Sequence, residues 1–191
     1  MFNLSSAFEK HYKQILCEDL LLKLNLPNIN QMPKITQTIL STTSERVATN
    51  QAFIVHTVSG LELISGQKLL ITKAKKSIST FKLREKQIIG AKVNLRQHLM
   101  YHFLEKTFFI VLPRCRSLCT KEMPSRSTKS ENLLANYNFG FDEEFILYPE
   151  LESHYEFFEY LKGCNINISI GPKSTLISVK KLLLTGFYII L

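Results

Sequence analysis

The sequence lacks several features that direct a chain toward common classes of protein. It has no tryptophan, and its four cysteines form no CxxC pair, which favours reduced thiols in an internal compartment. The longest apolar runs, Phe108–Leu112 and Leu182–Leu191, fall short of the roughly 20 residues that cross a bilayer. No Gly-rich phosphate loop, nucleophile elbow or HExxH pattern is present. We therefore expect neither a membrane-spanning protein nor an enzyme built on a common motif.

Histidines and carboxylates offer only weak signs of chemistry. His98 and His102 lie four residues apart on a predicted helix, a spacing compatible with a metal, but Leu-Met-Tyr stands between them. Cys115 and Cys119 have an unusual spacing for zinc. The neighbouring acids Glu143 and Glu144 are more typical of a solvated edge than of a catalytic pair. We expect no catalytic residue, no metal site and no cofactor.

Acidic residues are almost absent from one stretch of the chain. Between Lys68 and Arg96 there are nine Lys and Arg residues and a single acid, Glu85, while the rest of the chain is balanced and the net charge is +8. Apolar residues recur through this basic segment, which favours a folded surface over a disordered arm. Because closely spaced cations repel one another until a polyanion neutralises them, the segment predicts a nucleic-acid partner, and a solvated lysine-rich face is the simpler alternative.

Periodicity predicts helices and strands in an irregular order. We expect helices near 7–24, 52–63, 97–111, 153–161 and 175–184, and strands near 34–40, 68–73, 91–96, 137–148 and 165–170. Residues 41–46 are predicted to form a polar turn, 74–87 a long basic hairpin loop, and 114–136 a long loop. Ser6 and Glu9 have the spacing of a capping box, Gly66 stands where a helix stops, and Pro113 is expected to end the helix at 97–111.

These elements predict an α+β fold, an antiparallel sheet with helices packed on one face. At 191 residues we expect a single domain. It divides into an N-terminal helix and loop (1–33), an N-terminal half with the basic segment (34–112), a loop insertion (113–136) and a C-terminal half (137–191).

The pleat of the predicted strands sorts their side chains onto two faces. In 92–96 the alternation places Lys92, Asn94 and Arg96 opposite Val93 and Leu95. The strand 165–170 alternates in the same way between polar and apolar residues, and so does 136–139. Any half-exposed sheet has a wet face, but asparagine is a poor strand former. A row of amides beside cations suits the 2′-hydroxyls and phosphates of RNA, which predicts an RNA-binding face.

Several motifs carry a family resemblance. They are Ser65–Lys68 (SGQK), Lys76–Arg84 (KSISTFKLR), Ile89–Arg96 (IGAKVNLR) and Pro113–Arg114. With them, the run from Ile64 to Arg116 resembles the central region of the large-subunit ribosomal protein L five family, whose members bind 5S rRNA. The blocks NYNFGFDEEFILYPELE and KGCNINISI resemble the C-terminal half of that family. The phrase PELESHYEFFEYLKGCNINI is especially similar to the mitochondrially encoded plant type.

The resemblance implies a structural constituent of the large ribosomal subunit. Its expected partners are 5S rRNA, large-subunit rRNA, P-site tRNA, neighbouring large-subunit proteins and, through a bridge, a protein of the small-subunit head. The expected rRNA-binding residues are Ser41, Gln67, Lys68, Thr72, Lys73, Lys92, Asn94, Arg96, Asn165 and Asn167. The expected tRNA-facing loop residues are Lys75, Lys76, Ser77, Phe81, Lys82 and Arg84. The polar face predicted from the pleat of the strands independently includes Asn94, Arg96 and Asn165.

The chain departs from the family after the first strand. Leu40–Glu45 lacks both glycines of the family motif Leu-Asn-x-Gly-x-Gly, and Ser41 replaces its asparagine, which indicates a different backbone path there. The N-terminal segment lacks the arginines of a transit peptide. The resemblance therefore implies an organelle-encoded mitochondrial protein, with the plastid as the alternative location. A free RNA chaperone or RNA-processing factor remains the alternative function, and a membrane-surface role is disfavoured because the basic segment has no long amphipathic helix.

Overall fold

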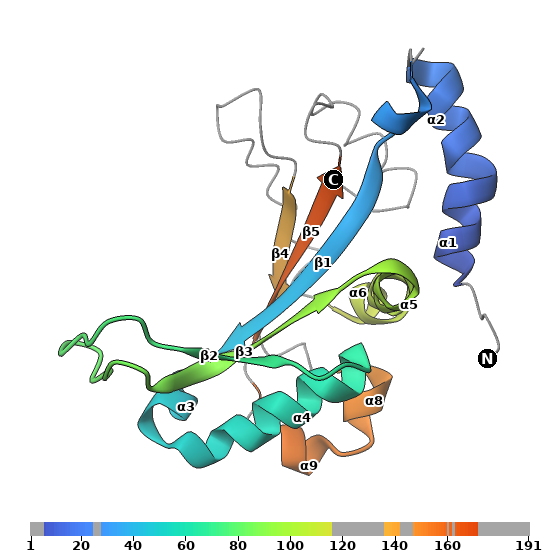
Figure 1. Ribbon diagram of the computed structural model, residues 1–191. Coiled ribbons are helices and arrows are strands. Elements are labelled where there is room, and N and C mark those ends of the chain that lie inside the picture. Colours follow the sequence, from blue (N-terminus) through green and yellow to red (C-terminus); the bar gives the residue numbers. More distant parts are fainter. Residues whose placement is uncertain are drawn as a thin grey trace. The chain divides into compact units, whose positions relative to one another are not determined.

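A computed structural model describes residues 6–24, 28–115, 136–141, 147–159, 161 and 163–171. Its five strands form one antiparallel sheet in the order β2-β3-β1-β5-β4 (Figure 1). The strands are β1 (Lys34–Thr43), β2 (Leu70–Lys73), β3 (Ile88–Leu95), β4 (Asn136–Phe141) and β5 (Cys164–Gly171). The sheet is antiparallel and is combined with helices, so the predicted α+β class is confirmed.

The first helical stretch agrees with the prediction. It consists of α1 (Ala7–His11), a π-helical segment (Tyr12–Leu16) and α2 (Cys17–Leu24). The Ser6 hydroxyl accepts a hydrogen bond from the Glu9 backbone N–H at 3.1 Å, which caps the free N-terminal donors as its position predicts. The Glu9 carboxylate accepts instead from Lys13 Nζ at 2.7 Å, one turn along the helix.

The other helices are short. They are two 3₁₀ turns (Ile29–Gln31 and Gln51–Phe53), α3 (Glu45–Thr49), α4 (Ile54–Ser65), α5 (Gln97–Lys106), a π-helical segment (Thr107–Val111), α6 (Leu112–Arg114), α8 (Pro149–Glu152) and α9 (Tyr155–Phe158). Gly66 ends α4 in the left-handed conformation (φ 64°), as predicted. Pro113 does not end the helical run. It lies at the second position of α6, which continues the preceding helical segments, and the run ends one residue later at Arg114.

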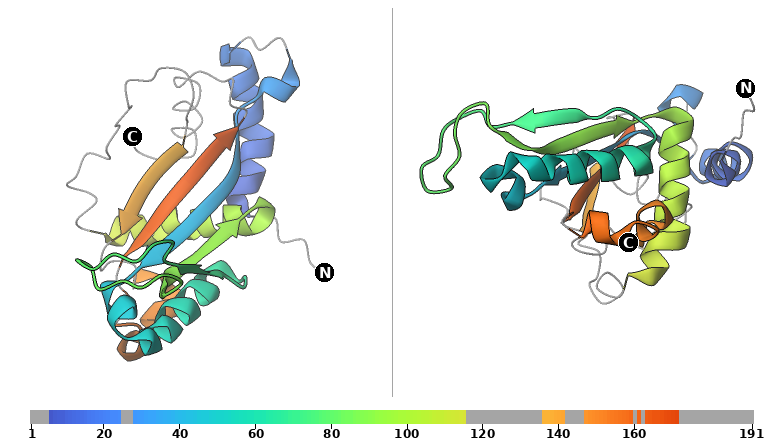
Figure 2. Two further views of the ribbon diagram at one scale, coloured as in Figure 1. Left: turned by 60° about the vertical axis from the view of Figure 1, so that its left-hand side comes forward. Right: turned by 90° about the horizontal axis from the view of Figure 1, so that it is seen from below.

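Contacts divide the chain into two compact units, residues 1–38, 96–137 and 168–191, and residues 39–95 and 138–167. In the first unit α1 packs on α5. The ring of Phe8 stacks on that of Phe108, with 6.3 Å between the ring centroids, and meets the ring of Phe109 edge-on, with 5.3 Å between the centroids. In the second unit α3 and α4 contact β3, and α8 and α9 contact α4 (Figure 2). The boundaries of the single predicted domain stay a prediction.

The polar turn predicted at 41–46 is wrong. Strand β1 continues through Thr43, and α3 begins at Glu45. Thr42 is buried, and its hydroxyl donates to the Gly163 carbonyl at 2.7 Å. The polar residues therefore serve a strand, because hydrogen bonds from neighbouring segments satisfy groups that would otherwise favour a turn.

Two predictions in the C-terminal half need correction. The strand predicted at 137–148 is shorter, since β4 ends at Phe141 and Tyr148 immediately precedes α8. The helix predicted at 153–161 is replaced by α8 and α9, because Pro149 starts a helix earlier and His154 (φ −126°, ψ 42°) interrupts it. The strand predicted at 165–170 is confirmed. Most of the loop predicted at 114–136 and the helix predicted at 175–184 lie outside the described residues.

Gly90 on β3 allows a close backbone contact with β1. A Cβ atom at this position would collide with the Thr42 carbonyl oxygen and would lie 3.0 Å from Thr43 Cα. Both obstacles are backbone atoms, which a change of side-chain rotamer cannot relieve. Gly90 is therefore required by the spacing of the two strands.

We predict that Gly90→Ala lowers the free energy of unfolding by about 2–3 kcal/mol, because the two strands must separate to admit the methyl group. Urea denaturation followed by circular dichroism measures the change. Gly140→Ala on β4 is the matched control, since its Cβ would meet only the flexible Asn165 Oδ1 at 2.9 Å and, more loosely, a carbonyl at 3.5 Å. An equal loss in both variants would contradict the role of the Gly90 contact.

Candidate RNA-binding surface

Strand β3 alternates between polar and apolar side chains. Val93 and Leu95 are buried, whereas Lys92 and Asn94 are exposed. The predicted separation into a dry and a wet face is therefore confirmed for this strand. Arg96 follows directly in an extended conformation, and its Nη2 donates to Gln37 Oε1 at 3.3 Å.

Strands β4 and β5 show the same alternation. On β5, Asn165 is exposed and Asn167 half-buried, while the isoleucines beside them are buried. Asn167 Oδ1 is buried and makes no hydrogen bond within the described part of the chain. On β4, Asn138 is exposed and Phe139 buried. Burial raises the pKa of Tyr137 to about 12, so its phenol stays neutral at physiological pH.

The register of β2 against β3 separates Thr72 from Lys73, two residues that are both expected to bind rRNA. Leu70 lies opposite Lys92 and Thr72 opposite Gly90, so Thr72 shares the face of Lys92. Thr72 Oγ1 is buried and has no hydrogen-bond partner among the described residues. Lys73 follows after a register shift and pairs with Ile88. The pleat therefore does not align Lys73 with the face that carries Thr72.

The remaining residues of the predicted rRNA set lie in a turn and on β1. Gln67 follows the left-handed Gly66, and its backbone N–H donates to the Ser65 hydroxyl at 3.3 Å. Lys68 is exposed before β2 begins. Ser41 is half-buried inside β1 and not in a turn. The turn after α4 thus holds Gln67 at a fixed place.

Residues 74–87 form a hairpin between β2 and β3 (Figure 1). Ile78 and Leu83 exchange backbone hydrogen bonds of 3.0 and 3.1 Å, and the Ser77 hydroxyl donates to the Leu83 carbonyl at 3.0 Å. At the base, the Lys86 N–H donates to the Ala74 carbonyl at 3.0 Å. The six residues predicted to face tRNA are all exposed on this hairpin: Lys75, Lys76, Ser77, Phe81, Lys82 and Arg84.

Gln87 attaches the hairpin to α3. Its Nε2 donates to the Ala48 carbonyl, and its Oε1 accepts from the Arg84 backbone N–H at 2.8 Å. The sequence gives no sign of this role, because a glutamine at the end of a loop does not indicate a partner 39 positions away. The side chain fixes the base of the hairpin against a helix.

Six cations of the basic segment form no ion pair within the described part of the chain. They are Lys75, Lys76, Lys82, Arg84, Lys86 and Lys92. Such side chains hold only mobile counterions. Their release to solution favours the binding of a polyanion.

The described residues contain no group of three or more His, Cys, Asp or Glu side chains placed to hold a metal. None of their helices combines the length and apolarity that a bilayer span requires.

Two family models match the chain. Residues 28–84 match the model described as ribosomal protein L5, and residues 88–189 match the model that describes the C-terminus of the same ribosomal protein family. The two matches meet within the hairpin, between Arg84 and Ile88, and together cover the whole described sheet.

Curated relatives agree with the models. The large ribosomal subunit protein uL5m of Prototheca wickerhamii is 38% identical over 188 residues, which is 94% of this chain and 79% of the relative. That of Reclinomonas americana is 38% identical over 184 residues, 96% and 97% of the two chains. The uL5 protein of Polynucleobacter asymbioticus is 34% identical over 171 residues, 90% and 91%. With both halves matched, the chain belongs to the L5 family of large-subunit ribosomal proteins.

Proposed function

We propose that this protein binds 5S rRNA and large-subunit rRNA in the central protuberance of the mitochondrial ribosome. The observation that carries the proposal is the wet face of β3, where Lys92 and Asn94 are exposed between buried residues and the lysine has no ion-pair partner among the described residues. A cation beside an amide can contact a phosphate and a 2′-hydroxyl together. The similarity to uL5m proteins supports the mitochondrial assignment, with the plastid as the alternative.

The exposed amides support the same proposal. Asn94 on β3 and Asn165 on β5 are exposed among buried apolar neighbours. An amide both donates and accepts hydrogen bonds, which suits a ribose 2′-hydroxyl. In this assignment the protein acts as a scaffold without catalytic chemistry.

The hairpin is proposed to serve a second RNA. Its exposed cations project from the end of two paired strands, so they can contact a neighbouring molecule while the sheet face holds rRNA. We assign them to the backbone of P-site tRNA. Contacts with neighbouring large-subunit proteins and a bridge to a protein of the small-subunit head complete the proposed set of partners.

Sedimentation in a sucrose gradient tests the ribosomal role against a free RNA chaperone. We expect the tagged protein to remain with the large subunit at high salt, because assembly buries contacts that salt does not screen. A chaperone held by phosphate contacts alone would be released, since its affinity falls steeply with salt. Release of the protein while other large-subunit proteins remain would favour the chaperone.

We predict that Lys92→Ala weakens 5S rRNA binding by about 1–2 kcal/mol, as expected for a charge-assisted hydrogen bond to phosphate. A binding titration with purified protein measures the change. Lys13→Ala removes the same charge from the N-terminal helical stretch, where the ammonium pairs with Glu9, and should change the affinity by less than about 0.5 kcal/mol. Equal losses of affinity in the two variants would show that the net charge of the protein, and not the position of Lys92, determines binding.

The hairpin assignment predicts a separate phenotype. Replacing Lys75, Lys76 and Lys82 by alanine should leave incorporation into large subunits nearly normal but speed P-site tRNA dissociation roughly tenfold, because several phosphate contacts are lost together. Subunit occupancy and tRNA off-rate are compared in the same particles. Replacement of Lys10, Lys13 and Lys23 on the N-terminal helices is the control of equal charge. Loss of occupancy with an unchanged off-rate would make the hairpin an assembly contact.

A further inference from the structure

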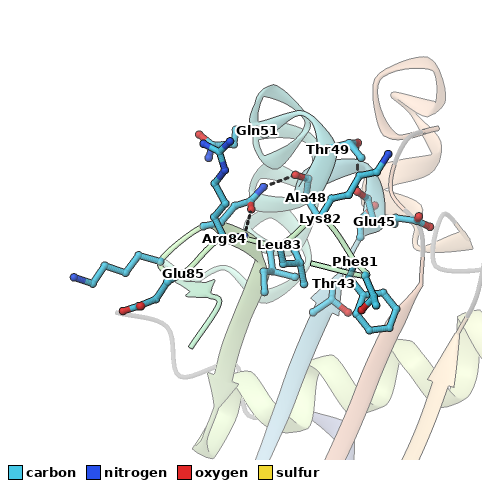
Figure 3. A pocket seen from close by; sticks show the side chains of 15 residues that line it. Thr43, Glu45, Ala48, Thr49, Gln51, Phe81, Lys82, Leu83, Arg84 and Glu85 are labelled. Carbon is cyan, nitrogen blue, oxygen red and sulfur yellow. Dashed lines mark hydrogen bonds between the residues drawn. The ribbon is translucent and has the colours of Figure 1, made fainter. Parts of the chain in front are cut away.

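A hollow of about 1070 Å³ lies between the hairpin and α3 (Figure 3). One wall consists of Glu45, Ala48 and Thr49 of α3 together with Gln51, and the other of residues 80–87. Thr43 and Ile89 line it from β1 and β3. Its size exceeds what a single nucleoside requires, since small-molecule sites commonly enclose about 300–1,000 Å³.

The hairpin wall combines an aromatic ring with cations. Phe81 is 73% exposed, an unusual position for a large apolar side chain on a hairpin rich in lysine. Lys82 and Arg84 extend from the same wall toward the side formed by α3 (Figure 3). An exposed ring on the same wall as cations is a combination that can bind single-stranded nucleic acid, through base stacking and phosphate contacts.

The opposite wall offers hydrogen-bonding groups. The Glu45 carboxylate accepts hydrogen bonds and the Gln51 amide both donates and accepts them. Side chains of this kind recognise the edges of nucleobases once a base has left its stack. A duplex keeps its bases stacked and their Watson–Crick edges paired, so it cannot place a base in the hollow.

Hydrogen bonds hold the two walls of the hollow together. Gln87 joins the two walls through its hydrogen bonds to the Ala48 carbonyl and the Arg84 N–H. A site that is held in this way loses little conformational entropy when it is occupied.

We infer that this hollow accepts an unstacked RNA base, with Phe81 as the stacking residue. The inference rests on the proposed RNA-binding function and adds to it the class of ligand, a base from a single-stranded loop. The cations contact the flanking phosphates, and the α3 wall faces the edge of the base. Phe81 thereby distinguishes an RNA with a single-stranded loop from a fully paired RNA.

The absence of tryptophan from the chain allows a direct test. A Phe81→Trp variant of the full chain carries a single indole fluorophore, whose emission is quenched when a base stacks on it. The probes are two RNA hairpins with the same stem and a loop of about seven nucleotides, within the length that a single-strand site commonly covers, one with normal bases and one with abasic sugars in the loop. Both present the same phosphates. Binding is measured separately by anisotropy of a dye on the RNA stem.

We expect the normal hairpin to reduce the emission roughly by half at saturation and the abasic hairpin to leave it nearly unchanged. A Tyr155→Trp variant, with its probe exposed on α9, should not respond to either RNA. Phe81→Ala should lower the affinity for the normal hairpin about tenfold, with less than about a twofold change for the abasic one. Phe81→Tyr, which keeps a ring face, should restore the affinity.

The possible results distinguish failure of the base site from failure of the proposed RNA binding. Equal binding of both hairpins without quenching would overturn the base site and leave phosphate binding intact. Quenching of the Tyr155→Trp variant to the same extent would also overturn the assignment to Phe81. If neither RNA hairpin binds, both the base site and RNA binding by residues 74–87 are rejected.

Discussion

The alternation of side chains along β3 is the constraint on which the rest of the structure depends. Val93 and Leu95 must be buried for the sheet to have a core, and the pleat then leaves Lys92 and Asn94 no place except the surface. A shift of the strand by one residue would bury a lysine and expose two aliphatic side chains. Folding and the proposed RNA contact therefore require the same register, and Gly90 helps to set it through its contact with β1.

Electrostatics opposes this arrangement in the free protein. The cations of the basic segment repel one another and find no ion-pair partner among the described residues, so no internal ion pair offsets their repulsion. The cost is small while water and counterions screen them. The same lack of internal partners leaves each cation available to phosphate, since no internal ion pair has to be broken first.

Local signals in the sequence predict the parts of the fold that depend on near neighbours. The Ser6 cap, the Gly66 stop and the alternation of β5 are each determined within a few residues, and the structure confirms them. The extension of β1 through Thr43 could not be predicted, because it depends on a hydrogen bond from Thr42 to Gly163, which is distant in the sequence. The contacts of Gln87 and Gly90 are hidden for the same reason.

The hairpin that we propose to bind RNA is built partly from residues that do not favour its backbone conformation. Lys82 (φ 53°) and Lys86 (φ 63°) adopt the left-handed conformation, which costs a residue with a side chain roughly 1–2 kcal/mol. Hydrogen bonds hold both against this cost, from Lys82 N–H to the Ser79 carbonyl at 3.1 Å and from Lys86 N–H to the Ala74 carbonyl at 3.0 Å.

Glycine would adopt these angles without strain, but it would remove the two cations. Strain at such positions persists only where surrounding contacts enforce it, and the Gln87 side chain provides one at the base of the hairpin. Lysine at these two positions therefore costs some stability but places a positive charge at a defined point of the backbone. Contacts with an RNA backbone depend on such placement.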